Sequence, residues 1–210
     1  MSKIVVFHHI PKCGGNSVNY CLQDWFNIKR DYRSDNRNNE FAAPINPHDL
    51  VEGDCLSGHW DIQGYYLHQR YPEVFEKSRF RLFSFLRDPL SVRLSLFRHE
   101  KKIGILGKNV LAKDIILSRP NYIANRFPLT KDNYVEILNR YEFIGILERG
   151  QESLDKLAKL YGKPRVEISK RNTTQIKEDS YITTDDINRF KELNQLDYKI
   201  YNYCLNKFFQ

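Results

Sequence analysis

Residues 4–26, IVVFHHIPKCGGNSVNYCLQDWF, give the clearest indication of the fold. Its β-branched and aromatic residues at 4–9 predict a short buried strand. A turn with two glycines follows at 11–15, and residues 16–26 have the composition of a helix. Because a strand, a glycine turn and a helix in this order are typical of α/β domains, the turn is expected at the carboxyl end of a parallel strand.

The rest of the chain alternates between expected strands and helices. Strands are predicted at 54–58, 80–86 and 143–147, and helices at 64–71, 89–102, 108–127 with an interruption at Pro120, 131–140, 151–161 and 184–208. The polar stretch 29–53 is predicted to be a loop. This alternation predicts an α/β fold: a P-loop-like three-layer domain, residues 1–210, with a mostly parallel central sheet flanked by helices.

The chain is basic, with 33 Lys and Arg residues against 26 Asp and Glu residues and a formal net charge of +7. This balance fits an anionic partner such as a nucleotide, a nucleic acid, an acidic glycan or a membrane surface, and it does not choose among them. Solubility alone would also explain the charge.

The cysteines and the apolar runs set the expected environment. Cys13, Cys21, Cys55 and Cys204 have neither the spacing of a metal site nor that of a disulfide framework, so a reducing, cytoplasmic location is expected. Residues 1–10 form too short an apolar run for a signal peptide or a membrane span, and no later segment reaches the length of a span. We therefore expect no integral membrane association.

The glycine turn has the residues of an anion-binding loop. Gly14 and Gly15 let the backbone approach an oxyanion, and the first amides of the following helix point at it. Lys12 adds a positive charge and Ser17 a hydroxyl, and either Asn16 or Ser17 can cap the helix. The nucleoside-triphosphatase loop reads GxxxxGK(S/T), whereas Lys12 precedes both glycines. We predict a nest for phosphate or sulfate, with a plain tight turn as the alternative.

A second anion site is predicted in FLRDPLSVRLSLFR, residues 85–98. Asp88 is expected to cap a helix whose first residue is Pro89, so Arg87 stands at the end of a strand. The planar fork of Arg87 suits a phosphate, and Ser95 lies two turns along the same helix. A structural Arg–Asp pair at a strand–helix turn is the alternative.

Together the two motifs resemble those of sulfotransferases that use 3′-phosphoadenosine 5′-phosphosulfate (PAPS). HIPKCGGNS is similar to the 5′-phosphosulfate loop of the carbohydrate group, which includes the heparan sulfate 2-O-sulfotransferases, and RDPLSVRLS to the 3′-phosphate motif. The resemblance implies that Lys12 contacts the phosphosulfate and assists departure of the leaving phosphate, while Arg87 and Ser95 bind the 3′-phosphate. It is specific in these two motifs and looser at YEFIGILER, residues 141–149, which is read mainly as core.

The resemblance also implies the full set of nucleotide contacts, which are Lys12, Cys13, Gly14, Gly15, Asn16, Ser17, Arg87, Ser95, Lys170 and Arg171. Cys13 is read as a small loop residue and not as a nucleophile. The family commonly has Thr where this chain has Asn16, and Asn can still donate a hydrogen bond. Lys170 and Arg171 belong to SKRNTT, which resembles a late loop that closes over the nucleotide; a solvated basic loop is the alternative.

The implied reaction is sulfuryl transfer to a hydroxyl by in-line displacement at sulfur, which needs a base near that hydroxyl and no metal. His59 in LSGHWDIQG is the predicted base, because it follows an expected strand end and because carbohydrate enzymes of the family often have a Gly-His-aromatic segment there. His99 is the second candidate and Glu100 the third. His8 and His9 lie on the first strand, where one could face the site, although packing is expected for both.

The acceptor is expected to be a saccharide or another hydroxyl compound, which could be acidic, and segments 29–53 and 104–128 are expected as loops or a lid on the acceptor side. Two other functions stay open. A P-loop nucleotide kinase or other phosphotransferase would need ATP and Mg²⁺, and the position of Lys12 before the glycines argues against it. A non-catalytic nucleotide- or RNA-binding module would bind in a salt-sensitive way, but no RNA-binding motif is visible, so no nucleic-acid partner is expected.

Overall fold

Five parallel strands form one sheet in the computed structural model, which describes residues 3–32, 43–76, 79–107, 109–168 and 182–210. The order across the sheet is β2–β3–β1–β4–β5, and the strands are β1 (Ile4–His8), β2 (Asn27–Asp31), β3 (Asp54–Gly58), β4 (Phe80–Leu86) and β5 (Tyr141–Ile146). The central strand β1 pairs in parallel with β3 on one side and with β4 on the other. The prediction of an α/β fold with a mostly parallel sheet is therefore confirmed.

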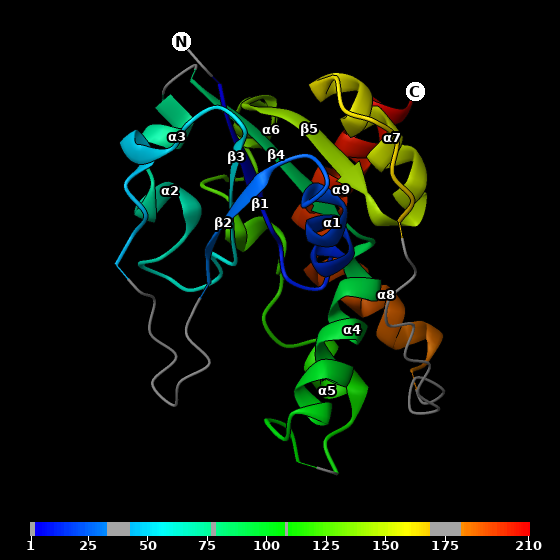
Figure 1. The fold of residues 1–210 in the computed structure, drawn as a ribbon. Coiled ribbons are helices and arrows are strands. Elements are labelled where there is room, and N and C mark those ends of the chain that lie inside the picture. Colours follow the sequence, from blue (N-terminus) through cyan, green and yellow to red (C-terminus); the bar gives the residue numbers. More distant parts are fainter. Residues whose placement is uncertain (1–2, 33–42, 77–78, 108, 169–181) are drawn as a thin grey trace.

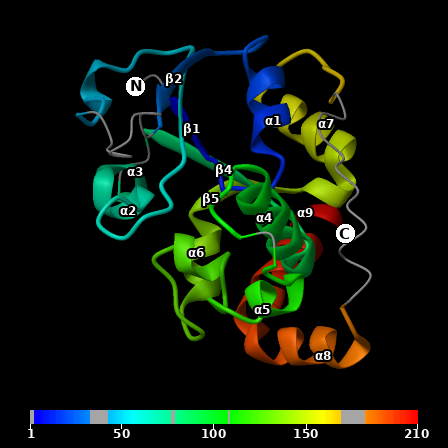
Figure 2. The same ribbon diagram turned by 90° about the horizontal axis from the view of Figure 1, so that it is seen from below.

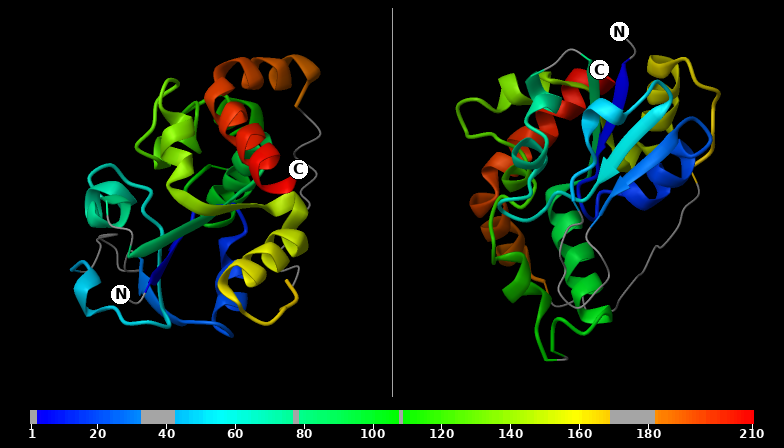
Figure 3. Two further views of the ribbon diagram at one scale, coloured as in Figure 1. Left: turned by 90° about the horizontal axis from the view of Figure 1, so that it is seen from above. Right: turned by 60° about the vertical axis from the view of Figure 1, so that its left-hand side comes forward.

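Helices cover both faces of this sheet and give the domain three layers (Figures 1 and 3). α1 (Gly15–Leu22) and α7 (Gly150–Tyr161) lie on one face, while α6 (Tyr134–Asn139) and α9 (Gln195–Phe209) lie on the other (Figure 2). α4 (Pro89–Lys102) and α5 (Ala112–Ile116) extend beyond the carboxyl ends of the strands. The remaining short or peripheral helices are η1 (Pro47–Asp49), α2 (Leu67–Arg70), α3 (Glu73–Glu76), η2 (Ala124–Arg126), η3 (Leu147–Arg149) and α8 (Thr184–Leu193).

The core is built on the two most apolar strands. All five residues of β1 are buried, and six of the seven residues of β4 are buried. Phe7 and Phe83 stack face to face across these strands with ring centroids 4.7 Å apart. Because both faces of the sheet are covered, the strands read as continuous apolar runs and not as alternating patterns. Each such buried side chain contributes about 1.5 to 3 kcal/mol to stability.

Strand β2 corrects the prediction of a loop at 29–53. Its sequence NIKRD carries no apolar alternation, yet residues Asn27–Asp31 pair with β3 along their whole length. An edge strand needs a partner on one side only, and charged side chains suit its open side. Pairing with β3 therefore outweighs the low strand propensity of these residues.

Several predicted helices are shorter or broken. α1 ends at Leu22 and not at residue 26, and α2 covers only Leu67–Arg70 of the predicted 64–71. In 108–127 the structure has only α5 and η2, because Arg119 and Asn121, on either side of Pro120, adopt φ angles of 51° and 54° that no α-helix contains. The predicted helix at 184–208 divides at Asn194, whose backbone leaves the helical region before α9 begins. Among the described residues, no helix is long and apolar enough to cross a membrane.

Candidate active site

The predicted loop, base and arginine follow three neighbouring strands, β1, β3 and β4. Since these strands are parallel, their carboxyl ends meet at one edge of the sheet, where α1 and α4 begin (Figure 1). The chain passes from β1 to β2 on one side and from β3 to β4 on the other, so this edge contains the switch point at which open α/β sheets bind ligands. The structure therefore brings the two predicted anion sites to one place.

The loop after β1 has an unusual backbone. Lys12 has a φ of 68° and Gly14 a φ of 82°, so two residues of this short turn are left-handed. Gly14 is the N-cap of α1, which corrects the prediction that Asn16 or Ser17 caps the helix. The N–H of Ser17 donates to the Gly14 carbonyl at 3.0 Å, and the N–H groups of Gly15 and Asn16 precede it at the open end of the helix. An anion is stabilised at such a helix start.

Side chains enclose this loop from two directions. A β-carbon at Gly14 would lie 2.4 Å from Leu147 Cδ1, and one at Gly15 would lie 1.9 Å from His9 Cδ2. Both glycines are therefore required by neighbouring side chains. Cys13, the residue before Gly14, is buried, and burial raises the pKa of its thiol, which disfavours the reactive thiolate.

Positive charges gather around the half-buried Lys12. Burial lowers the pKa of Lys12 first, and the charges of Arg87 and Lys102 lower it further. The pKa of His99 on α4 is lowered by burial and then by Lys12, and that of Arg98 by burial and then by Arg87. Cations that raise one another's energy in this way favour an anionic ligand, which would relieve the repulsion.

The turn between β4 and α4 holds Arg87 at this edge. Asp88 caps α4 as predicted, because its Oδ1 accepts from the N–H of Ser91 at 2.8 Å. Glu148 Oε1 accepts from the N–H of Asp88 at 3.0 Å and lies 4.0 Å from Arg87 Nε. Tyr201 donates its hydroxyl proton to the other oxygen of Glu148. The carboxylate therefore orients the turn that carries Arg87.

The other residues of the second motif divide into two groups. Ser95 is half-buried on α4, which starts beside Arg87. Arg93 is buried and donates to the carbonyls of Ile115 and Ser118, so it joins α4 to α5 and to the residues just after α5. The predicted ligand roles of Arg87 and Ser95 stay predictions.

His59 follows β3, is half-buried, and lies against His9. The Nε2 atoms of the two rings are 3.1 Å apart, and the ring centroids are 3.9 Å apart. His9 is 3% exposed, and burial, followed by the charges of His59, His8 and Lys12, lowers its pKa well below the usual range. The low pKa favours the neutral imidazole at His9, whose ring contacts His59 and lies beside Gly15.

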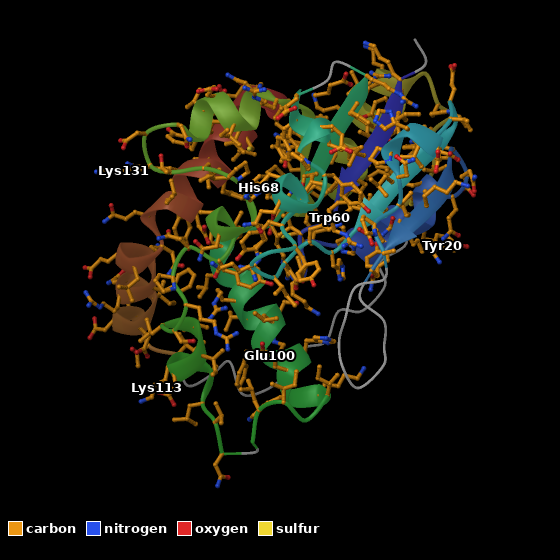
Figure 4. The ribbon with its side chains drawn as sticks, turned by 90° about the vertical axis from the view of Figure 1, so that its left-hand side faces the viewer. Tyr20, Trp60, His68, Glu100, Lys113 and Lys131 are labelled. Carbon is orange, nitrogen blue, oxygen red and sulfur yellow. The ribbon has the colours of Figure 1, made fainter. Side chains whose placement is uncertain are left out.

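The remaining candidates lie farther along α4 or outside the described residues. His99 is exposed, and Glu100, labelled in Figure 4, is half-buried near the end of α4. Lys170 and Arg171 lie outside the part of the chain that the structure describes. Among the described residues, no three His, Cys, Asp or Glu side chains are grouped so that they could hold a metal ion.

The chain superposes on a sulfotransferase from Alicyclobacillus acidocaldarius with a TM-score of 0.51 and 11% identity, over 93% of this chain and 96% of the other. It superposes on mouse sulfotransferase SULT7A1 complexed with PAP with a TM-score of 0.58 and 11% identity, over 96% of this chain and 89% of the other. The chain has the fold of these sulfotransferases. No protein-family model and no curated protein sequence matches it.

Sequence reasoning assigned no role to several residues that organise this edge. These are Asn19, Tyr32, Ser57 and Glu148, while packing was the first expectation for His9 and a position facing the site the alternative. The one available signal was the pair His8–His9 at the end of a buried strand, since consecutive side chains on a strand point to opposite faces. The structure follows that rule, because His9 contacts His59 whereas His8 donates or accepts at the hydroxyl of Tyr141, 2.8 Å away.

Proposed function

We propose that the chain is a sulfotransferase that moves the sulfuryl group of PAPS to a hydroxyl of an acceptor. The observation that carries the proposal is the placement of two anion-binding elements after adjacent strands. Lys12 follows β1 and Arg87 follows β4, and the charge of Arg87 lowers the pKa of Lys12. PAPS has one anionic group on each side of its adenosine, so a single molecule would engage both elements.

Each residue has a defined task in this proposal. The helix start at Gly15–Ser17 and the ammonium of Lys12 hold the 5′ side and stabilise charge on the leaving phosphate. Arg87 and Ser95 hold the 3′-phosphate. The acceptor oxygen bonds to sulfur while the bond from sulfur to the phosphate oxygen breaks, and His59 takes the acceptor proton. Adenosine 3′,5′-bisphosphate leaves.

The fold supports the assignment of PAPS as the donor, and the identity of the acceptor is a separate part of the proposal. The mouse protein with the same fold was solved with PAP, which is what sulfuryl transfer from PAPS leaves behind. We propose a saccharide hydroxyl as the acceptor, because the phosphate loop resembles that of the carbohydrate enzymes. Cytoplasmic location is proposed on the cysteines, since all four are buried and none forms a disulfide.

A ligand panel tests the donor. Adenosine 3′,5′-bisphosphate at 100 times its dissociation constant stabilises the folded protein by about 2.7 kcal/mol, and the melting temperature rises accordingly. ATP with Mg²⁺ and a single-stranded oligonucleotide are expected to raise it less. A larger rise with ATP and Mg²⁺ would identify a phosphotransferase, and a larger, salt-sensitive rise with the oligonucleotide a nucleic-acid-binding module.

An acceptor screen with labelled PAPS and a panel of glycans tests the reaction itself. His59→Ala should lower kcat by about 10²- to 10⁴-fold, the range for a general base, and leave nucleotide affinity nearly unchanged. Lys12→Ala should lower both kcat and nucleotide affinity. A His59→Ala variant that keeps near-full activity would remove His59 from the mechanism.

A further inference from the structure

A chain of buried polar groups ends at the candidate base. The hydroxyl oxygen of Tyr32 lies 3.2 Å from His9 Nδ1, and His9 Nε2 lies 3.1 Å from His59 Nε2. We propose that His9 is a positioning residue for the base: it holds the His59 ring in place and keeps the His59 proton on Nε2, so that the lone pair is on Nδ1. This inference rests on the proposed function, because it takes His59 as the base.

The polar groups behind His9 allow one fully satisfied order of hydrogen bonds. Ser57 donates to Asn19 Oδ1 at 2.9 Å, and Asn19 Nδ2 donates to the Tyr32 oxygen at 2.7 Å. The Tyr32 hydrogen can then go to Ser57 Oγ, 3.1 Å away. This leaves the Tyr32 oxygen able to accept a second hydrogen bond, donated by the N–H group at His9 Nδ1. Asn19 Nδ2 carries two protons: one goes to Tyr32, and the other would meet His9 Nδ1 at 3.4 Å, which is longer than the 3.2 Å contact between His9 Nδ1 and the Tyr32 oxygen. The proposed order therefore uses the shorter contacts.

This order fixes both imidazoles. A neutral imidazole has one donor and one acceptor nitrogen, so His9 with its proton on Nδ1 presents a lone pair at Nε2. His59 must then donate from Nε2, and its own lone pair is on Nδ1. When His59 takes a proton on Nδ1, its Nε2–H still has an acceptor. The arrangement follows the general rule that a third group orients the base.

The surroundings of His9 keep it neutral during this step. The titratable groups that influence it are His8, whose side chain lies on the opposite face of the sheet, His59 after β3, Lys12 in the loop after β1 and Tyr32 after β2. Burial and the first three of these groups disfavour a positive charge on His9. A proton taken from the acceptor therefore stays on His59 and does not pass inward.

His9 also connects the base to the donor site. Its ring fills the space beside Gly15, the first residue of α1, and stacks on Phe7 with centroids 5.4 Å apart. One rigid ring therefore sets the distance between the base and the start of the anion-binding helix. In-line transfer depends on this distance, because the base must sit on the acceptor side while the helix holds the leaving group.

Nitrogen NMR of the histidine rings tests the inference without any acceptor. In the full chain with adenosine 3′,5′-bisphosphate, we expect neutral His59 to carry its proton on Nε2 and His9 on Nδ1. His9→Phe keeps a ring but removes both nitrogens, and His59 should then show a mixture of tautomers. A His59 proton on Nδ1 in the wild type, or a His59 spectrum unchanged in His9→Phe, would overturn the proposal.

Two further variants keep the test decisive if His9→Phe does not fold. His9→Gln places a carboxamide oxygen near the Nε2 position, so it should restore the His59 tautomer. Tyr32→Phe leaves His9 in place and removes the acceptor of its Nδ1 proton, so both tautomers should change. The proposal is also contradicted if a folded His9→Gln variant does not restore the His59 tautomer and Tyr32→Phe changes the tautomer of neither ring.

Kinetics separate positioning from a purely structural role. His9→Phe should lower kcat by about 100-fold with little change in the KM for PAPS, and His9→Gln should recover part of the loss. Adding His9→Phe to His59→Ala should cost little more than His59→Ala alone, because His9 acts through His59. Fully additive losses would assign His9 a structural role only. If the wild type neither binds the bisphosphate nor uses PAPS, the proposed function fails, whereas the NMR result still decides the coupling of the two rings.

Discussion

The imidazole of His9 occupies the space that any side chain at Gly15 would need, because a β-carbon there would lie 1.9 Å from both Cδ2 and Nε2 of His9. The loop after β1 and the histidine pair are therefore one packed unit. A glycine that the sequence analysis explains by the approach of an anion is also required by His9, the residue that contacts the proposed base His59.

Gly15→Ala tests this packing. The new methyl group must displace the His9 ring, so the free energy of unfolding should fall by about 1 to 3 kcal/mol. Activity should fall with it, because His59 loses its neighbour. Denaturant titration and the PAPS assay measure the two effects. Gly150→Ala is the matched control at the start of α7, where a β-carbon would lie 3.6 Å from Ile168 Cδ1, an ordinary contact. Equal effects of the two substitutions would show that the contact with His9 is unimportant.

Lys12 should lower the free energy of unfolding while it increases the affinity for the nucleotide. Its φ of 68° is strained for a residue with a β-carbon. Lys12→Gly relieves this strain and should raise the free energy of unfolding by up to about 1 to 2 kcal/mol. Lys12→Ala keeps the strain, so it lacks this gain. Both variants should lose affinity for adenosine 3′,5′-bisphosphate in calorimetry. A Lys12→Gly protein that binds the nucleotide as tightly as the wild type would show that the ammonium is not a ligand.

Stability should fall in acid because of His8. Burial, with the charges of His68 and Arg126, lowers the pKa of His8 to about 3. The unfolded chain takes up a proton near pH 6.5 and the folded chain does not, so this contribution is present above pH 6.5 and is lost as the pH falls toward 3. The free energy of unfolding should fall by about 1.4 kcal/mol per pH unit for this one group.

His8→Asn isolates that contribution. Its unfolding free energy should vary less steeply between pH 6.5 and 3 than that of the wild type, by about one proton. Asp197 acts in the opposite direction, because burial raises its pKa to about 6, but it is present in both proteins and cancels from the difference. Identical pH slopes would mean that His8 is protonated in the folded state.

Asp31 should be a main anchor of the His59 segment. Its carboxylate accepts from Arg70 Nε at 2.6 Å, from Arg70 Nη2 and the Tyr71 hydroxyl at 2.8 Å, and from Trp60 Nε1 at 2.9 Å. Asp31→Ala leaves a buried guanidinium without this partner and should cost about 3 to 5 kcal/mol of unfolding free energy. Glu142→Ala breaks the more exposed pair with Arg81 and should cost no more than about 1 kcal/mol. Equal losses would contradict the anchor role.

The strands of the sheet could be predicted from the sequence where burial on both faces determines the pattern of apolar residues. β1 and β4 are covered on both faces, so their apolar runs are unambiguous, and the cap at Asp88 follows from local chemistry. β2 was not predicted because its stability comes from pairing with β3, and its own polar residues do not indicate this pairing. Local rules also misplaced the cap of α1, because the left-handed backbone at Gly14 already ends the turn.

The candidate site also contains residues that the sequence predicts and residues that it does not. Lys12, Arg87 and His59 were placed correctly at one edge because each follows a predicted strand of a parallel sheet. The contacts of His9 could not be predicted, since its partners His59, Tyr32 and Asn19 come from three other parts of the chain. Only the packed structure brings such polar groups together, and the same holds for Glu148 beside Arg87.

The proposed function requires one adenosine nucleotide to bridge the loop after β1 and the turn after β4. A crystal structure of the chain with adenosine 3′,5′-bisphosphate would show the contacts of both phosphates. We expect the 5′-phosphate on the N–H groups of Gly15 and Asn16 and on Lys12, and the 3′-phosphate on Arg87 and Ser95. A nucleotide bound elsewhere, or one that touches Lys12 while Arg87 stays with Glu148 and out of reach, would contradict it.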